Sequence, residues 1–130
     1  MNRSDMANVY KNQQIMTATP EELTLMLYNG AIRFVSESIQ GIEERNIPKA
    51  HAANIRAQQI IREFMATLDM SYDIAHSLDK LYEYIEYRLI QGNMKKDKIQ
   101  LEEAKSMLQE LRDTWLQAMK QVRGQKAVGK

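Results

Sequence analysis

The side chains that could do chemistry in this chain are few and scattered. His51 and His76 each stand alone, because neither belongs to a Glu-x-x-His pair of the kind that holds metals in helical bundles. The acidic pairs Glu43-Glu44 and Glu102-Glu103 are sequence neighbours, which diverge around a helix instead of converging on a substrate. The chain has no cysteine, so it offers no thiol nucleophile, thiolate ligand or disulfide. The sequence therefore predicts neither an enzyme nor a metal or cofactor site.

The charge balance and the length narrow the class of protein further. The 130 residues suit one domain, and 18 basic against 17 acidic residues give a net charge of +1. A nucleic-acid binder would show a basic excess, so no nucleic-acid partner is expected. No apolar run has the length of a membrane span, and the first residues lack the apolar core of a signal peptide. We expect a cytoplasmic protein with no membrane insertion.

The clearest element is a helix expected over residues 20–45. Thr19 is placed to cap it, Pro20 suits its first position, and Glu22 lies three residues after the cap. Its apolar residues cover roughly 200° of the circumference, about twice what a surface helix needs. They are Leu23, Leu25, Leu27, Tyr28, Ile32, Phe34, Val35, Ile39 and Ile42. The surplus must be covered by other helices or by a partner.

Three further helices are expected, over residues 48–68, 72–90 and 97–122. Asn46 is placed to cap the first of them, and Ser71 alone to cap the second, which Gly92-Asn93 would end with a left-handed residue. Asp97 and Gln100 have the spacing of a capping box for the last helix. No segment shows the alternation of a strand. Short connectors make sequential helices antiparallel, which predicts an all-α, up-down-up-down four-helix bundle.

The termini are expected to lie outside this bundle of residues 19–122. Residues 1–18 form a flexible arm whose apolar residues, including Met6, Val9 and Tyr10, stand in a segment too polar to fold alone. We hypothesise that the arm covers an apolar groove until a partner displaces it. Simple disorder is the alternative. Residues 123–130 are expected to be a flexible basic tail.

Apolar surface beyond the needs of one core recurs on the second and third helices. The nine methionines and six tyrosines suit a groove that is filled with water when free and excludes water when a partner binds, because their side chains combine apolar area with flexibility or a polar group. Such grooves bind amphipathic helices. Methionine and tyrosine at helical spacing can equally fill a core, and a surplus apolar face can also pair with a second copy of the chain. A homodimeric helical structural or interaction protein, and a small helical enzyme with an unrecognised site, therefore stay open as alternatives.

Several short motifs, in order, give the chain a family resemblance. They are Thr19-Pro20-Glu21-Glu22-Leu23, Leu25-Met26-Leu27-Tyr28-Asn29-Gly30-Ala31-Ile32-Arg33-Phe34, Ile55-Arg56-Ala57 with Ile60-Ile61, Leu81-Tyr82-Glu83-Tyr84 and Leu111-Arg112-Asp113-Thr114-Trp115. The chain resembles the FliS family, the flagellin-specific export chaperones of bacterial flagella, over about residues 7–122. Asn29 stands where the family usually has Asp, and Tyr10 stands where it has an N-terminal tyrosine.

The resemblance implies a chaperone that binds the disordered C-terminal segment of flagellin in apolar grooves. Binding would prevent premature polymerisation and assist delivery to the flagellar export apparatus, and the export gate and other flagellar regulators would be further partners. The expected partner-binding residues are Tyr10, Ile55, Ile60, Phe64, Leu78, Leu81, Tyr82, Ile85 and Leu89. Spacing alone does not say which of them face flagellin and which fill the interior. Leu27, Tyr28 and Trp115 are assigned mainly to the core.

Overall fold

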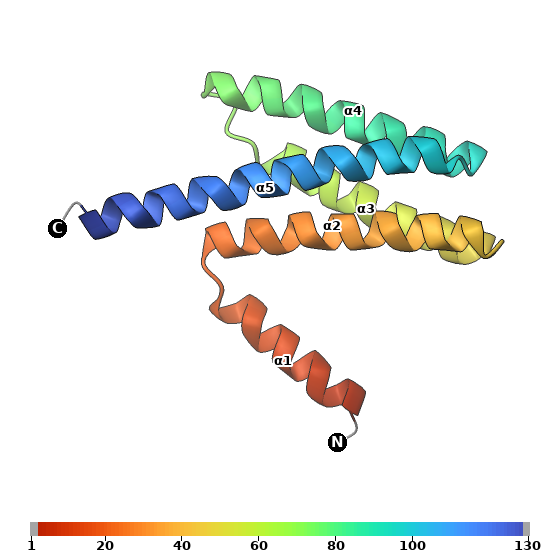
Figure 1. Ribbon diagram of the computed structural model, residues 1–130, viewed down its shortest axis with the longest axis horizontal. Coiled ribbons are helices and arrows are strands. Elements are labelled where there is room, and N and C mark those ends of the chain that lie inside the picture. Colours follow the sequence, from red (N-terminus) through yellow and green to blue (C-terminus); the bar gives the residue numbers. More distant parts are fainter. Residues whose placement is uncertain (1–2, 129–130) are drawn as a thin grey trace.

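A computed structural model describes the backbone of residues 3–128 and the side chains of residues 5, 6, 8, 9 and 11–124 (Figure 1). The described residues form helices and contain no strand, so the all-α class is confirmed. The helices are α1 (Arg3–Thr17), α2 (Pro20–Glu43), α3 (Ile47–Thr67), α4 (Asp73–Lys95) and α5 (Lys98–Val128). None of them is long and apolar enough to cross a membrane.

Side-chain caps begin α2 and α3 where the sequence predicts them. The Thr19 hydroxyl accepts a hydrogen bond from the Glu22 amide at 3.2 Å, and Pro20 is the first residue of α2. The Asn46 side-chain oxygen accepts one from the Lys49 amide, also at 3.2 Å. Each cap satisfies an amide that has no partner within its helix. These bonds form between near neighbours, so they need no tertiary contact.

The junction of α4 and α5 differs from the prediction. Helix α4 continues past Gly92-Asn93 to Lys95, and Lys96 adopts the left-handed conformation with φ of 50°. Gly92 lies inside the helix, where α5 packs against it: a Cβ atom at Gly92 would lie 2.5 Å from Leu101 Cδ2. The reciprocal capping box is absent from this junction. Asp97 accepts from the Ile99 amide, whereas Gln100 accepts from Arg88.

Two smaller expectations about helix ends also need correction. Helix α2 ends at Glu43, before Arg45, whose φ of 58° is left-handed. The Ser71 hydroxyl bonds Asp69, and no side chain caps α4. Helix α1 covers most of the segment expected to be a flexible arm, and α5 continues through much of the expected tail to Val128. The flexibility of the two segments stays a prediction.

The core lies among α2, α3, α4 and α5. Helix α2 packs against α3 and α5, and α4 packs against the same two helices. Figure 1 shows that consecutive helices of this group run alongside each other with their connections at alternating ends, while α1 projects away from them. The buried core residues are Tyr28, Ala31, Ile32, Val35, Ile39, Ala57, Ile61, Phe64, Tyr82, Ile85, Leu89, Leu101, Ala104 and Leu108. Every pair of packed helices contributes to this one cluster.

Candidate functional site

A first apolar groove runs between α2 and α3. Its volume is about 370 Å³, and it is lined by Leu27, Phe34, Arg56, Gln59, Ile60 and Glu63. The apolar members, Leu27, Phe34 and Ile60, are half-buried and pack against the core from outside. Their outer faces remain open to solvent, so they form the floor of the groove. The polar members all come from α3 and form one rim.

Arginines hold the aromatic ring at one end of this first groove. The guanidinium carbons of Arg33 and Arg56 lie 5.1 and 5.5 Å from the centre of the Phe34 ring. Contacts of this kind contribute about 0.5–1 kcal/mol at exposed sites. Arg33 also pairs with Glu37 at 3.9 Å, whereas Arg56 has no carboxylate partner among the described residues. The rim therefore presents an available positive charge beside an apolar floor.

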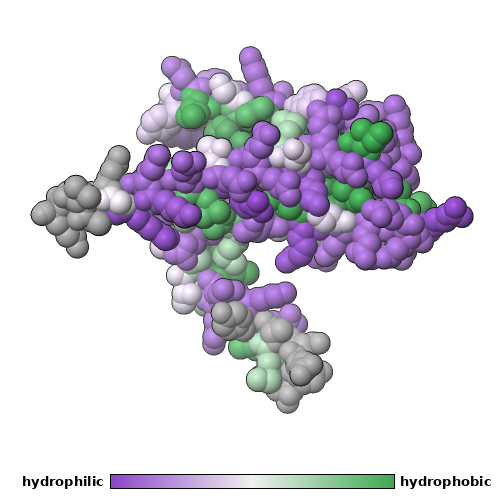
Figure 2. All heavy atoms as spheres, viewed as in Figure 1, coloured by the Kyte–Doolittle hydropathy of each residue, from purple (hydrophilic) through white to green (hydrophobic). Residues whose placement is uncertain are grey.

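A second, smaller groove lies between α4 and α5. Its volume is about 150 Å³, and it is lined by Leu81, Met107, Glu110, Leu111 and Thr114. Leu81 is 40% exposed, while Met107 and Leu111 are half-buried against the core. Figure 2 shows hydrophobic surface over α4, on α1, and along the seam between α5 and α2, within an otherwise hydrophilic face. Helix α4 thus leaves apolar area uncovered on this face.

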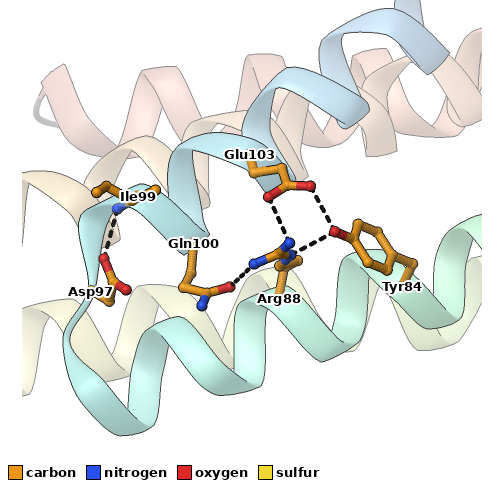
Figure 3. A network of polar contacts seen from close by, with 6 residues as sticks. All are labelled: Tyr84, Arg88, Asp97, Ile99, Gln100 and Glu103. Atoms are coloured by element: carbon orange, nitrogen blue, oxygen red, sulfur yellow. Dashed lines mark hydrogen bonds and ion pairs between the residues drawn. The ribbon is translucent and has the colours of Figure 1, made fainter.

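A polar network closes the α4–α5 seam beyond the second groove (Figure 3). Arg88 Nη2 pairs with Glu103 Oε2 at 3.0 Å, Arg88 Nε donates to the Tyr84 hydroxyl at 2.8 Å, and that hydroxyl donates to Glu103 Oε1 at 2.7 Å. The hydrogen bond to Tyr84 raises the pKa of Arg88. Tyr84 follows Leu81 by about one turn. The network therefore joins α4 to α5 about one turn along α4 from Leu81.

A third hollow, of about 320 Å³, lies where the start of α2 meets the far part of α5. It is lined by Thr19, Glu21, Glu22, Trp115, Ala118, Met119, Val122 and Arg123. The indole N–H of Trp115 donates to the Glu21 carbonyl at 3.0 Å, which fixes the ring against α2. The tryptophan packs against the core, as predicted, and also walls this open hollow.

Four of the predicted partner-binding residues lie in the core instead. Phe64 and Tyr82 are 7% and 3% exposed, and Ile85 and Leu89 are fully enclosed. Phe64 stacks between Tyr28 and Tyr82, with ring centres 4.5 and 5.4 Å apart, and the two tyrosine hydroxyls share a hydrogen bond of 2.6 Å. Burial raises the pKa of both tyrosines. In this structure these residues hold the helices together, and their role in partner binding stays a prediction.

The other predicted residues have mixed placements. Ile60 lines the first groove and Leu81 lines the second. Ile55 and Leu78 are half-buried and line neither groove. Tyr10 belongs to α1, but its side chain lies outside the described part of the structure. The structure thus brings Ile60 and Leu81 to two separate grooves and does not unite the predicted set in one site.

Most residues on the floors of the two grooves are absent from the set of partner-binding residues predicted from the sequence. Phe34, Met107 and Leu111 line the grooves, and so does Leu27, which the sequence places mainly in the core. The signal available in the sequence was the width of the apolar stripe on α2. Residues at the edge of such a stripe are the first to reach the surface. Leu27 and Phe34 are two turns apart on that helix, so they line the same side of it.

Open apolar grooves between packed helices are typical of proteins that bind amphipathic segments of other chains. The chain matches the family model described as flagellar protein FliS over residues 2–122, and it belongs to this family. It is 38% identical over 114 residues to the flagellar secretion chaperone FliS of Bacillus subtilis, a match that spans 88% of this chain and 86% of that protein. The resemblance predicted from the motifs is confirmed.

More distant relatives carry the same description. The flagellar secretion chaperone FliS of Salmonella typhimurium is 30% identical over 114 residues, which span 85% of this chain and 84% of that protein. The protein of that name from Vibrio cholerae is 29% identical over 106 residues, or 80% and 78% of the two chains. These relatives are named as chaperones and not as enzymes, which agrees with the class expected from the sequence.

Proposed function

We propose that this protein is an export chaperone that binds the disordered C-terminal segment of flagellin in its apolar grooves. The observation that carries the proposal is that Leu27, Phe34 and Ile60 between α2 and α3, and Leu81, Met107 and Leu111 between α4 and α5, keep apolar surface open to solvent. An amphipathic helix laid along such a groove buries one apolar side chain at each turn or two. Flagellin bound in this way cannot polymerise in the cytoplasm and is held ready for the export apparatus.

The energetics favour a client that contacts both grooves. One well-buried leucine or isoleucine contributes about 1.5–3 kcal/mol. Ordering a disordered segment costs about 2–5 kcal/mol, and association costs about 4 kcal/mol or more. Two anchors contribute about 3–6 kcal/mol, which falls short of a summed cost of about 6–9 kcal/mol or more. Several anchors, spread over both grooves, are needed to leave a net affinity. We therefore propose one client segment that forms two helices, one for each groove.

The arrangement of helices supports this mode of binding. We propose that α2–α5 form an antiparallel up-down-up-down four-helix bundle, whose two seams, α2–α3 and α4–α5, are the grooves. We further propose that the arm, including Tyr10, is the part that shields a groove in the free protein. The flagellar export gate and other flagellar regulators are the further partners proposed for the loaded chaperone.

The test is binding of a fluorescently labelled flagellin C-terminal peptide, followed by anisotropy. Leu81→Asp should weaken binding at least tenfold, because it places a charge on the groove floor, and that loss corresponds to about 1.4 kcal/mol. Ile74→Asp is the matched control: Ile74 lies on the same helix, is 69% exposed and lines neither groove. No binding by the unaltered protein would refute the proposal, and a stable dimer in sedimentation that leaves the peptide unbound would favour the homodimer.

A further inference from the structure

Two of the glycines in the packed helices have a clear structural reason. A Cβ atom at Gly41 would lie 2.7 Å from the backbone nitrogen of Ala50, and one at Gly92 would lie 2.5 Å from Leu101 Cδ2. Such distances are closer than atoms in proteins approach, so a side chain would push α3 away from α2, or α5 away from α4. At these two positions the fold itself requires glycine.

Gly30 has no such reason. A Cβ atom there would meet only Ile60 Cδ1, at 3.5 Å, which is an ordinary van der Waals contact. Its backbone is helical, and no described glycine has a positive φ. Glycine within a helix is less stable than alanine, because the unfolded chain loses more conformational freedom on folding. The chain's own structure would therefore be better served by alanine at this position.

The position of Gly30 beside the first groove suggests what it does. It lies about one turn from Leu27 and one turn from Phe34, on the side of α2 that faces Ile60. The groove floor is made of those three apolar residues. Gly30 itself is only half-buried. The absence of a side chain there leaves room between Leu27 and Phe34, which we call the Gly30 notch.

We propose that the Gly30 notch receives one apolar side chain of the client helix and so fixes the register in which that helix binds. This inference rests on the proposed chaperone function and names a residue that determines its specificity. Knob-shaped side chains of one helix commonly enter spaces between the residues of another. Leu27, Phe34 and Ile60 would surround the inserted side chain.

The charges beside the notch define the occupant further. Arg56 and Glu63 lie on the α3 rim, seven residues or about 10 Å apart. Arg56 has no carboxylate partner among the described residues. The rim therefore suits a helix that carries an acidic and a basic residue about two turns apart, with its apolar anchor on the adjoining face. A rim of mixed sign favours such a peptide over a uniformly charged lipid surface.

The test compares Gly30→Ala and Gly30→Leu with the control Gly124→Ala, using the labelled flagellin C-terminal peptide. Gly124 lies in α5, where a Cβ atom would meet nothing within 4 Å, so its replacement gains helix stability away from the groove. Both alanine variants should melt a few degrees higher than the unaltered protein. Gly30→Ala should bind the peptide about tenfold more weakly, as expected for overpacking, and Gly124→Ala should bind it normally.

A rescue experiment separates the notch from a general effect on folding. Each apolar residue of the peptide is shortened to alanine in turn, and one such peptide should bind Gly30→Leu more tightly than the unaltered peptide does. Unchanged affinity of Gly30→Ala would overturn the inference, and so would a lower melting temperature, which would give the glycine a structural role. The inference would also be overturned if Gly30→Ala weakened the association of the protein with a second copy of itself and left its affinity for the peptide unchanged. Failure of the unaltered protein to bind the peptide would instead refute the proposed function.

Discussion

Leu81 and Tyr82 are adjacent in the sequence, yet aspartate should weaken client binding at the first position and unfold the protein at the second. Leu81 is 40% exposed on the floor of the second groove, whereas Tyr82 is 3% exposed in the core. Full burial of a leucine is worth about 1.5–3 kcal/mol, so losing the buried part of Leu81 should cost about 1–2 kcal/mol of unfolding free energy. That leaves the protein folded while the groove loses its floor.

The loss at Tyr82 should be several times larger. Removing a buried aromatic side chain costs about 3–5 kcal/mol. Tyr28 also loses the partner of its 2.6 Å hydrogen bond, and a buried hydroxyl left without a partner costs about 1–3 kcal/mol. The sum, before any cost of burying a carboxylate, is about 4–8 kcal/mol. Domains are stable by only about 5–15 kcal/mol, so Tyr82→Asp should be unfolded or nearly so.

Urea unfolding followed by far-ultraviolet circular dichroism measures both effects, and peptide anisotropy measures binding. Leu81→Asp should keep its helicity and lose client affinity. Tyr82→Asp should lose helicity. Its peptide affinity would then report unfolding and not the groove. If Tyr82→Asp were as stable as Leu81→Asp, the stack of Tyr28, Phe64 and Tyr82 would not be part of the core, and the division between groove and interior would be refuted.

Three further predictions concern the tyrosine pair and the arm. Tyr28→Phe should lower the unfolding free energy by about 1–2 kcal/mol, because the Tyr82 hydroxyl is left unpaired; a double Phe variant that is no more stable than this single one would contradict the reason. Burial raises the folded-state pKa of both tyrosines above the ordinary 10.0. Their contribution to the unfolding free energy is therefore complete below pH 10 and is lost as the pH rises above it. Urea midpoints measured from below to above pH 10 should fall for the unaltered protein and fall less for the double Phe variant. Deletion of residues 1–17 should raise peptide affinity and dye binding to apolar surface if the arm shields a groove, and unchanged values would exclude the shield.

Features that depend on near neighbours were predictable from the sequence. Thr19 and Asn46 cap their helices as expected, because each bond joins residues three apart. The all-α class followed from apolar periodicity and the lack of strand patterns. The family followed from the order of several short motifs, and the comparisons confirm it. None of these depends on how one helix meets another.

Features that depend on contacts between helices could not be predicted from the sequence. Gly92 has the sequence character of a helix end, but the approach of Leu101 places it inside α4. Phe64 and Ile60 share one broad apolar stripe of α3, yet the first is enclosed and the second lines a groove. Periodicity tells which side of a helix is apolar, because it is a property of one helix. Where the core ends and the groove begins depends on which neighbours cover that side, and only the packed helices determine this.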